Sequence, residues 1–327
     1  MKAIVIREPG PPEVLELQQR PTPEPGSREL LVQVHAAAVN RADLLQRRGR
    51  YPPPPGAPAD IPGLEYAGTV ARIASDVTEW DVGDRVMGIT GGGAYAEYVV
   101  VHEGEALPVP QHLTFVEAAA LPEAGITAHD ALVTRCHLHA GESVLIHAAG
   151  SGVGTAAVQL AQALGARVLG TARTAAKLER ARPLGLHDGV VATDEWPEHV
   201  LAATNGRGVD VVLDLVGGDY LAGNVRVLAP RGRLIIVGLV AGRTAPLDMG
   251  AVLGKRLDIH GTVLRTRTRD EKIIAAGLFT RDVFPFLAAD EVRPVIDRVL
   301  PLSEAAEAHR LLEANETFGK VILMVQG

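Results

Sequence analysis

Apolar and polar positions follow two different patterns along the chain, and the change falls near Glu123. Before it, short apolar runs are separated by turns rich in proline and glycine, which is typical of β-strands. The expected strands are residues 2–6, 29–36, 65–73, 85–88 and 94–101. This half predicts an antiparallel β domain, a partly open barrel.

After Glu123, apolar runs alternate with helical patterns, which predicts an α/β domain with a doubly wound parallel sheet. Its six expected strands are residues 144–146, 167–171, 189–191, 209–215, 233–237 and 257–263. A helix over 269–287, a strand over 295–300, a helix over 303–313 capped by Ser303 and a strand over 319–324 follow. The expected domains are residues 1–122, completed by 266–327, and residues 123–265.

The turn between the first two strands of this sheet carries the first chemical signal. Aligned on its last glycine, the dinucleotide pattern G-x-G-x-x-G reads Ala149-x-Ser151-x-x-Gly154. The unpaired N–H groups of a helix start suit a pyrophosphate, so we expect it to lie against Gly150, Ser151, Gly152 and Val153. An ordinary strand-to-helix turn is the alternative. The strand before, the helix after and the next strand favour a nucleotide.

The end of the second strand predicts which nucleotide is bound. An NAD site places a carboxylate there to hold the ribose hydroxyls, but this chain has Thr171 and Arg173, and no acid before Glu179. Arg173 and Lys177 stand four residues apart at the start of an expected helix, 174–182, and so share a face that attracts a 2′-phosphate. The sequence therefore predicts NADP(H), with a solvated basic helix face as the alternative.

Two further loops follow the fourth and fifth strands of this sheet. Open α/β sheets bind ligands at the carboxyl ends of their strands. The expected coenzyme residues of these loops are Val216, Gly217, Gly238, Leu239 and Val240.

Composition narrows the class of protein. The chain has 327 residues, is 47% hydrophobic and carries a formal net charge of −7, which gives no electrostatic footprint for nucleic acid. The single cysteine, Cys136, excludes an internal disulfide and suits a reducing compartment, so we expect a cytoplasmic protein. No signal peptide is expected, and no apolar run approaches the roughly 20 residues of a membrane span.

Several segments together resemble a known family. They are Val39-Asn-Arg-Ala-Asp-Leu44, Pro62-Gly-Leu-Glu-Tyr-Ala-Gly68, Val82-Gly-Asp-Arg-Val86, Gly91–Val99, the central turn and Glu313–Lys320. The chain resembles the medium-chain dehydrogenase/reductase superfamily in its zeta-crystallin-like quinone oxidoreductase branch. Within that branch, the segment 146–157 is most similar to the tumour-suppressor-inducible type. The resemblance implies a GroES-like catalytic domain, a Rossmann domain, NADPH and a homodimer or homotetramer.

The departures from the zinc enzymes of that superfamily concern their metal ligands. Those enzymes carry a cysteine before the Asp-Leu segment and a histidine in Gly-His-Glu, where this chain has Asn40-Arg41 and Leu64. A structural zinc lobe needs four cysteines, and this chain has one. We therefore expect no metal site, and we interpret His137 and His139 as a polar loop.

The resemblance also implies a role for several single residues. Asn40, which could otherwise be a turn residue, and Tyr51, which could otherwise be a packed aromatic, are expected to shape the substrate cleft. The Tyr51 ring is also expected to contact the coenzyme. Thr127 is expected near the nicotinamide, and Lys320, whose alternative is a surface charge, near the coenzyme with Leu264. For Glu65 the safer interpretation is a carboxylate on a strand face, although it could close a hydrogen-bond network.

Three functions remain open at this stage. The first is an NADPH-dependent quinone reductase, because a quinone is already an electrophile and needs positioning beside the nicotinamide more than it needs a strong base. The second is reduction of an activated alkene, as in enoyl or alkenal reductases, with Tyr51 as a proton donor. The third is an NADPH-binding structural or RNA-binding protein, which the acidic net charge disfavours. The apolar run 257–263 is expected at the sheet edge, where it would pair in a dimer.

Overall fold

The computed structural model describes residues 1–325 and divides into two compact units. The first unit holds Met1–Glu123, Arg265–Thr280 and the chain from Pro294 onward, and the second holds Ala124–Leu264 and Arg281–Arg293. Residues 281–293, expected in the first domain, therefore group with the second unit. At the end of this segment, the Gln159 amide of the second unit donates to the backbone oxygen of Arg293 at 3.0 Å and accepts from its N–H at 2.9 Å.

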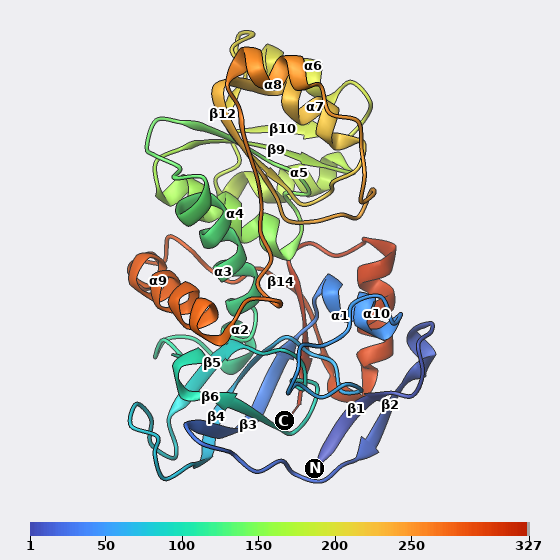
Figure 1. The fold of residues 1–327 in the computed structure, drawn as a ribbon, viewed down its shortest axis with the longest axis vertical. Helices are drawn as coiled ribbons and strands as arrows, with labels where there is room; N and C mark the ends of the chain where they lie inside the picture. The colour runs from blue at the N-terminus through green and yellow to red at the C-terminus, as the bar shows by residue number, and fades with distance from the viewer. Residues whose placement is uncertain (326–327) are drawn as a thin grey trace. The chain divides into compact units, whose positions relative to one another are not determined.

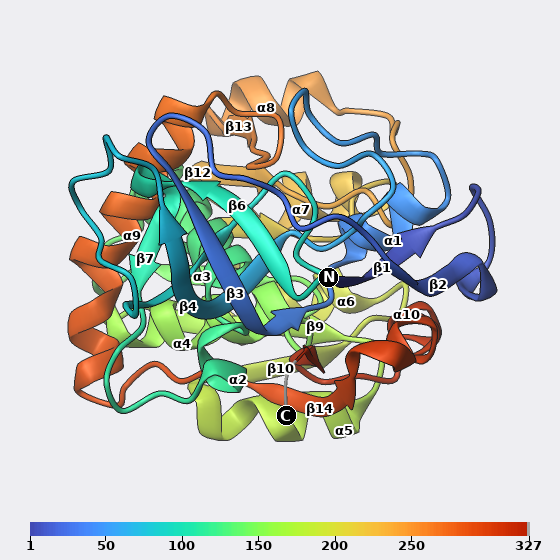
Figure 2. The same ribbon diagram turned by 90° about the horizontal axis from the view of Figure 1, so that it is seen from below.

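The first unit contains a seven-stranded main sheet in the order β14-β15-β3-β4-β5-β7, with β6 paired to β3, and a separate β1–β2 hairpin. Figure 2 shows the long strand β3 in the foreground beside β4 and β6, the strands with which it pairs. The strands are β1 (Lys2–Ile6), β2 (Leu15–Gln19), β3 (Glu29–Ala38), β4 (Glu65–Ile73), β5 (Arg85–Ile89), β6 (Tyr98–His102), β7 (Ala106–Pro108), β14 (Ile296–Pro301) and β15 (Lys320–Met324). Its short helices are α1 (Arg41–Arg47), α2 (Phe115–Ala118) and α10 (Ala305–Ala314).

Some elements of the first unit differ from the prediction. β2, β7 and α1 were not expected, and the strand expected from residue 94 begins only at Tyr98. β14 lies parallel to β15, so the unit is not purely antiparallel. Ser303 lies in a 3-10 turn, Leu302–Glu304, and does not cap α10. The return of the chain end to this unit is confirmed, because β15 pairs antiparallel with β3.

The second unit contains the expected six-stranded parallel sheet, in the order β10-β9-β8-β11-β12-β13. The strands are β8 (Ser143–Ile146), β9 (Arg167–Ala172), β10 (Asp188–Val191), β11 (Val209–Asp214), β12 (Leu228–Ile236) and β13 (Asp258–Gly261). The helices are α4 (Gly152–Ala163), α5 (Ala175–Ala181), α6 (Trp196–Ala203), α7 (Tyr220–Val227) and α8 (Met249–Lys255). Figure 1 shows α6, α7 and α8 over one face and α4 and α5 over the other.

Two longer helical segments complete the chain. α3 (Pro122–His129) continues into a π-helical turn, Asp130–Arg135. α9 (Arg269–Ala288) agrees closely with the helix expected over 269–287. No helix among residues 1–325 combines the length and apolar character needed to cross a membrane.

The strand order places the topological switch between β8 and β11, at the centre of the parallel sheet. Val144, Leu145 and Ile146 of β8 are fully buried, as expected for a strand covered by helices on both faces. The edge position of β13 was predicted and is confirmed. Ligands of doubly wound sheets bind at such a switch, beyond the carboxyl ends of the strands.

Candidate active site

Three neighbouring strands of the first unit bring Asn40, Glu65 and Lys320 together at one end of the strands. Asn40 follows the end of β3, and the antiparallel partner β4 begins at Glu65. On the other side of β3, the antiparallel strand β15 begins at Lys320. Residues separated by up to 280 positions in the chain therefore share one hydrogen-bond network.

The network around Lys320 is buried and closely paired. The Lys320 Nζ donates to Glu65 Oε1 and to Asn40 Oδ1, both at 2.6 Å. Asn40 Nδ2 donates to the same Glu65 oxygen at 2.8 Å, and the N–H of Glu123 donates to the other, Oε2, at 2.9 Å. Lys320 is 5% exposed and Glu65 is fully buried. The interpretations of Lys320 as a surface charge and of Glu65 as a strand-face carboxylate are therefore both wrong.

Asp43 ties helix α1 to this network. Its Oδ2 accepts from the backbone N–H of Asn40 at 2.8 Å, and its Oδ1 accepts from Gly63 at 3.1 Å. Burial raises the pKa of Asp43 to about 6, while the hydrogen bond from Asn40 and the charge of Lys320 oppose the rise. Asp43 thus holds Asn40 at the start of the helix, which makes it a positioning residue that the sequence analysis missed.

Glu123 is a second carboxyl group that the sequence analysis did not single out. Burial raises the pKa of Glu123 to about 8, and the neighbouring charge of Glu65 adds to the rise. Glu123 is therefore predominantly protonated at neutral pH. A protonated carboxyl that feels the charges of Glu65 and Lys320 is chemically able to donate a proton in this part of the unit.

We expect Glu123 to give the stability of the protein a specific pH dependence. Because its folded pKa lies above the unfolded value near 4.5, its stabilising contribution is complete below pH ~4.5 and is lost as the pH rises through about 8. Relative to Glu123→Gln, which imitates the protonated acid, the wild type should lose about 2–4 kcal/mol of unfolding free energy across this range. Urea unfolding of both proteins at several pH values measures the difference, and a constant difference would contradict the assignment.

The Tyr51 loop is anchored by a buried arginine. Arg265 is 5% exposed and donates to the backbone oxygens of Tyr51 at 3.0 Å and Gly91 at 2.9 Å, and to the side-chain oxygen of Gln46. Its guanidinium lies 4.8 Å from the centroid of the Tyr51 ring, a cation–π contact. One face of that ring is therefore covered, so a flat substrate would have to stack on the other face.

The turn between β8 and α4 has the geometry expected of a pyrophosphate cradle. Ser151 is the N-cap of α4, and its Oγ accepts from the N–H of Gly154 at 3.0 Å. A Cβ at Gly154 would lie 2.3 Å from the backbone oxygen of Ala148, so only glycine allows this close packing of helix and turn. Gly152 and Val153 form the first helical turn, where N–H groups have no partner within the helix. These residues fit a dinucleotide.

The end of β9 lies next to this turn and carries the residues predicted to select the coenzyme. Arg173 is exposed, and Lys177 is half-buried in α5. Because Thr174 caps α5, Arg173 precedes the helix, and the prediction that the two cations share a helical face is wrong. Glu179, the first acid after the strand, forms a 3.0 Å ion pair with Arg182. Both cations remain predicted coenzyme residues.

Thr171, at the end of β9, belongs to a buried hydrogen-bond network under the candidate nucleotide-binding turn. It is 1% exposed, and its hydroxyl lies 2.8 Å from Nδ1 of the buried His147. His147 Nε2 lies 2.7 Å from Asn224 Oδ1, and Asn224 Nδ2 donates to Asp214 at 2.9 Å. Since the Asn224 oxygen accepts, His147 carries its proton on Nε2 and accepts from Thr171. These hydrogen bonds connect the carboxyl ends of β9, β8 and β11, and the sequence analysis missed this network.

The loops after β11 and β12 complete this edge of the parallel sheet. Asp214 Oδ1 accepts from the N–H groups of Val216 and Gly217, both at 2.8 Å. The first loop is therefore held by the same aspartate that binds Asn224. Leu239 and Val240 are 50% and 49% exposed in the second loop, which follows the end of β12 at Ile236. Their contact with a coenzyme stays a prediction.

Two other predicted residues are buried. Leu264 is 5% exposed and Thr127, in α3, is 7% exposed, both within the second unit. Their roles also stay predictions. Among residues 1–325, no cluster of three or more histidine, cysteine, aspartate or glutamate side chains could hold a metal ion.

The doubly wound sheet with its capped, glycine-containing turn and the separate β unit with a buried polar cluster define a two-domain nucleotide-dependent oxidoreductase. Residues 26–111 match the alcohol dehydrogenase GroES-like domain, and residues 152–278 match the family described as zinc-binding dehydrogenase. A quinone oxidoreductase of Pseudomonas aeruginosa is 35% identical over 99% of both chains. The chain therefore belongs to the medium-chain dehydrogenase/reductase superfamily, quinone oxidoreductase type, and it is an oxidoreductase.

Solved structures of similar proteins have the same fold. A structure described as an NAD-dependent alcohol dehydrogenase is 35% identical, with a TM-score of 0.88 and full coverage of both chains. A mycobacterial protein solved with NADPH is 30% identical, with a TM-score of 0.90 over 99% of this chain and 100% of that one. The CurK enoyl reductase is 27% identical, with a TM-score of 0.87 over 99% of both. These likenesses support a nicotinamide coenzyme and a small-molecule substrate.

Proposed function

We propose that the protein is an NADPH-dependent quinone oxidoreductase that acts on ortho- or para-quinones without a metal. The observation that carries the proposal is the likeness to the Pseudomonas aeruginosa quinone oxidoreductase, which spans 99% of both chains. The buried cluster of Asn40, Glu65 and Lys320 supports the metal-free part of the proposal. The Lys320 ammonium group already binds the oxygens of Asn40 and Glu65 that a metal ion would need as ligands.

The coenzyme residues proposed from the second unit are those of the cradle and of the β9 end. The turn at Gly150–Val153 would hold the pyrophosphate, and Arg173 with Lys177 would hold the 2′-phosphate. When bound, NADPH supplies the electrons of the reduction. The absence of a carboxylate at the β9 end is what favours NADPH over NADH here, against the NAD-dependent description of one similar structure.

The proposed work of the first unit is to orient the acceptor and to hold a proton. The Asn40 amide is fixed by Lys320 and Glu65, so its orientation costs little entropy when a substrate binds. The Glu123 carboxyl holds a proton at neutral pH, and the Tyr51 hydroxyl is a second donor. A reduced quinone oxygen can take its proton from either group or from water.

Reduction of an activated alkene is the second candidate, and the likeness to the CurK enoyl reductase favours it. An alkene needs a placed proton donor for its α-carbon, whereas a quinone does not. Replacing Tyr51 with phenylalanine should therefore abolish most alkene reduction and change quinone reduction little.

One assay separates the candidates. NADPH oxidation is followed with 1,2-naphthoquinone, with a 2-alkenal and with no acceptor, for the wild type and for Tyr51→Phe. We expect turnover with the quinone in both proteins. Turnover with the alkenal alone would exclude the quinone function, and no turnover with either acceptor would favour a protein that binds NADPH without a main catalytic role.

We also propose a homodimer formed through the edge strand β13. The neighbouring helix α8 exposes Met249 and Leu253, at 71% and 78%, and Val263 beyond the strand is 46% exposed. An unpaired strand edge beside exposed apolar side chains can pair with its own copy about a two-fold axis. Leu253→Glu should shift the protein toward the monomer in light scattering, whereas Val82→Glu, at an exposed site in the other unit, should not. An unchanged mass for Leu253→Glu would contradict this interface.

A further inference from the structure

A pocket of about 380 Å³ lies in the first unit, where the loop after β1 faces the end of helix α1. It is lined by Pro9, Gly10, Pro11, Pro12, Arg47, Arg48, Arg50 and Glu313. Its volume falls within the lower range of small-molecule sites. Gly49, between Arg48 and Arg50, has a φ of 68°, a left-handed conformation that glycine adopts easily.

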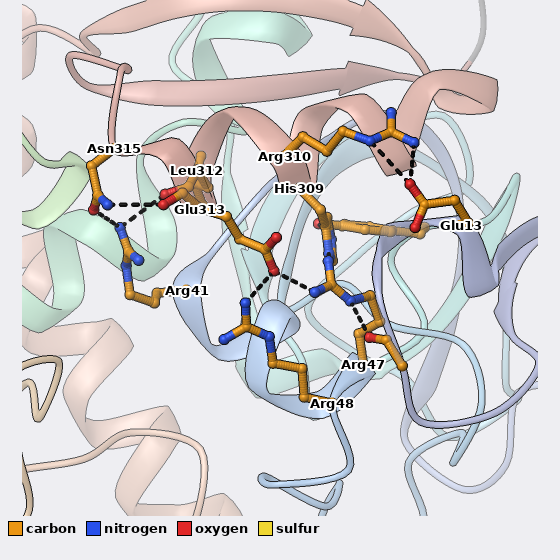
Figure 3. A network of polar contacts seen from close by, with 11 residues as sticks. Glu13, Arg41, Arg47, Arg48, His309, Arg310, Leu312, Glu313 and Asn315 are labelled. Atoms are coloured by element: carbon orange, nitrogen blue, oxygen red, sulfur yellow. Dashed lines mark hydrogen bonds and ion pairs between the residues drawn. The ribbon is translucent and has the colours of Figure 1, made fainter.

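The charge of the pocket is strongly positive although the whole chain is acidic. Three arginines face one glutamate, and Glu313 is already shared between Arg47 and Arg48 (Figure 3). Within the described residues, the Arg50 side chain forms neither an ion pair nor a hydrogen bond. The excess of two positive charges matches the charge of a phosphate monoester near neutral pH, which is close to two negative units.

Arg47 forms a preorganised floor for the pocket. It is 1% exposed, and its Nε donates to the backbone oxygen of Gly10 at 3.0 Å. Its two terminal nitrogens donate to His309 Nδ1 at 3.2 Å and to Glu313 (Figure 3). A guanidinium fixed in this way presents its charge to a ligand without losing side-chain freedom on binding.

A buried hydrogen-bond chain leads from this pocket to the candidate active site. Burial together with the charges of Arg47 and Arg48 lowers the pKa of His309 to about 3, so the ring is neutral and accepts from Arg47 at Nδ1. Its Nε2–H then faces the Tyr95 hydroxyl at 3.4 Å, and that hydroxyl donates to Asp43 Oδ2 at 3.1 Å. Asp43 is the residue that holds the backbone of Asn40.

Helix α1 is a second connection between the same two places. Asn40 is its N-cap and Arg47 its last residue, so seven residues, a rise of about 10 Å, separate the polar cluster from the pocket. A ligand that draws the Arg48 guanidinium away from Glu313 changes the pairing of Arg47, the residue at which both connections begin.

We propose that this pocket binds a small phosphate-bearing molecule, and that its occupancy changes the position of Asn40 and so the rate of the reaction. The binding site is independent of the proposed function, whereas the effect on the rate rests on it. The experiment therefore has one part for each.

Calorimetric titration with inorganic phosphate, at constant ionic strength held by chloride and without coenzyme, tests the binding. We expect Arg48→Gln/Arg50→Gln to weaken phosphate binding by at least about tenfold, because it removes two of the three cations. Arg7→Gln, an exposed arginine of the same unit that pairs with Glu8 and Glu16, should leave the affinity unchanged. Arg173→Gln/Lys177→Gln should remove any phosphate bound at the coenzyme site and leave this pocket's binding intact.

The result that overturns the site is phosphate binding that is absent in the wild type or unaffected by Arg48→Gln/Arg50→Gln. For the second part, quinone turnover at saturating NADPH should respond to phosphate in the wild type and not in Arg48→Gln/Arg50→Gln. An equal response in both proteins refutes the connection to Asn40. A protein that is inactive toward quinones but binds phosphate through Arg48 and Arg50 would refute the proposed function while leaving the site in place.

Discussion

Replacing Lys320 with methionine should destabilise the first unit by about 3–5 kcal/mol, because it leaves the buried Glu65 carboxylate without its counter-ion. The ammonium group also holds the Asn40 oxygen, so the same change should lower turnover by loosening Asn40. Urea unfolding followed by fluorescence measures the loss. The two tryptophans lie in different units, so a Trp196→Phe background makes Trp80 report the first unit alone.

Two variants make this expectation specific. Lys2→Met removes an exposed lysine from the same unit and should change the unfolding free energy by less than about 0.5 kcal/mol. Adding Glu65→Gln to Lys320→Met should recover part of the lost stability, because no unpaired charge is then buried. If Lys320→Met behaves like Lys2→Met, the pair contributes nothing and the polar cluster is not held as described.

The combined change Arg173→Gln/Lys177→Gln should raise the KM for NADPH by about 10- to 100-fold and leave that for NADH nearly unchanged. Each charge-assisted contact to the 2′-phosphate contributes about 1.5–3 kcal/mol, and the exposure of Arg173 reduces this through solvent screening. Every factor of ten in affinity corresponds to about 1.4 kcal/mol. Steady-state kinetics with both coenzymes measure the ratio.

The matched control for this change is Arg182→Gln, which removes a cation from the same region that is already paired with Glu179. It should affect both coenzymes little. An equal loss of NADPH and NADH affinity in Arg173→Gln/Lys177→Gln would show that the two cations hold the pyrophosphate or the fold and do not select the coenzyme.

The alternation of apolar runs determined the parallel sheet from the sequence alone. Val144–Ile146 is a continuous apolar run because helices cover both faces of β8. All six strands of this sheet were predicted, although β12 begins at Leu228, earlier than its expected start at residue 233. The turn at Ser151–Gly154 was found for a related reason: a helix cap and a close approach of helix to turn each demand particular residue types at fixed spacing. Such local requirements restrict the residue types at neighbouring positions, so they can be recognised in the sequence.

The family resemblance added what these patterns could not supply. Asn40, Tyr51 and Lys320 were proposed through motifs spread over the chain, and spacing alone gave each of them a plausible structural role instead. For Lys320, the alternative of a surface charge was wrong, and its expected place near the coenzyme stays a prediction. A lysine after Gly319 is usually a surface residue, and only the pairing of β15 with β3 buries it against Glu65.

The sequence by itself determined the elements whose cause is local: apolar periodicity, capping and the small residues of the cradle. The tertiary structure alone decided the polar networks, namely Lys320 with Glu65, His147 with Asn224 and Arg47 with His309. Each joins residues far apart in the chain, and a polar side chain is stable when buried only if its partner arrives from another element. Burial also shifts the pKa values of titratable side chains. The proton held by the Glu123 carboxyl and the neutral ring of His309 therefore could not be predicted from the order of residues.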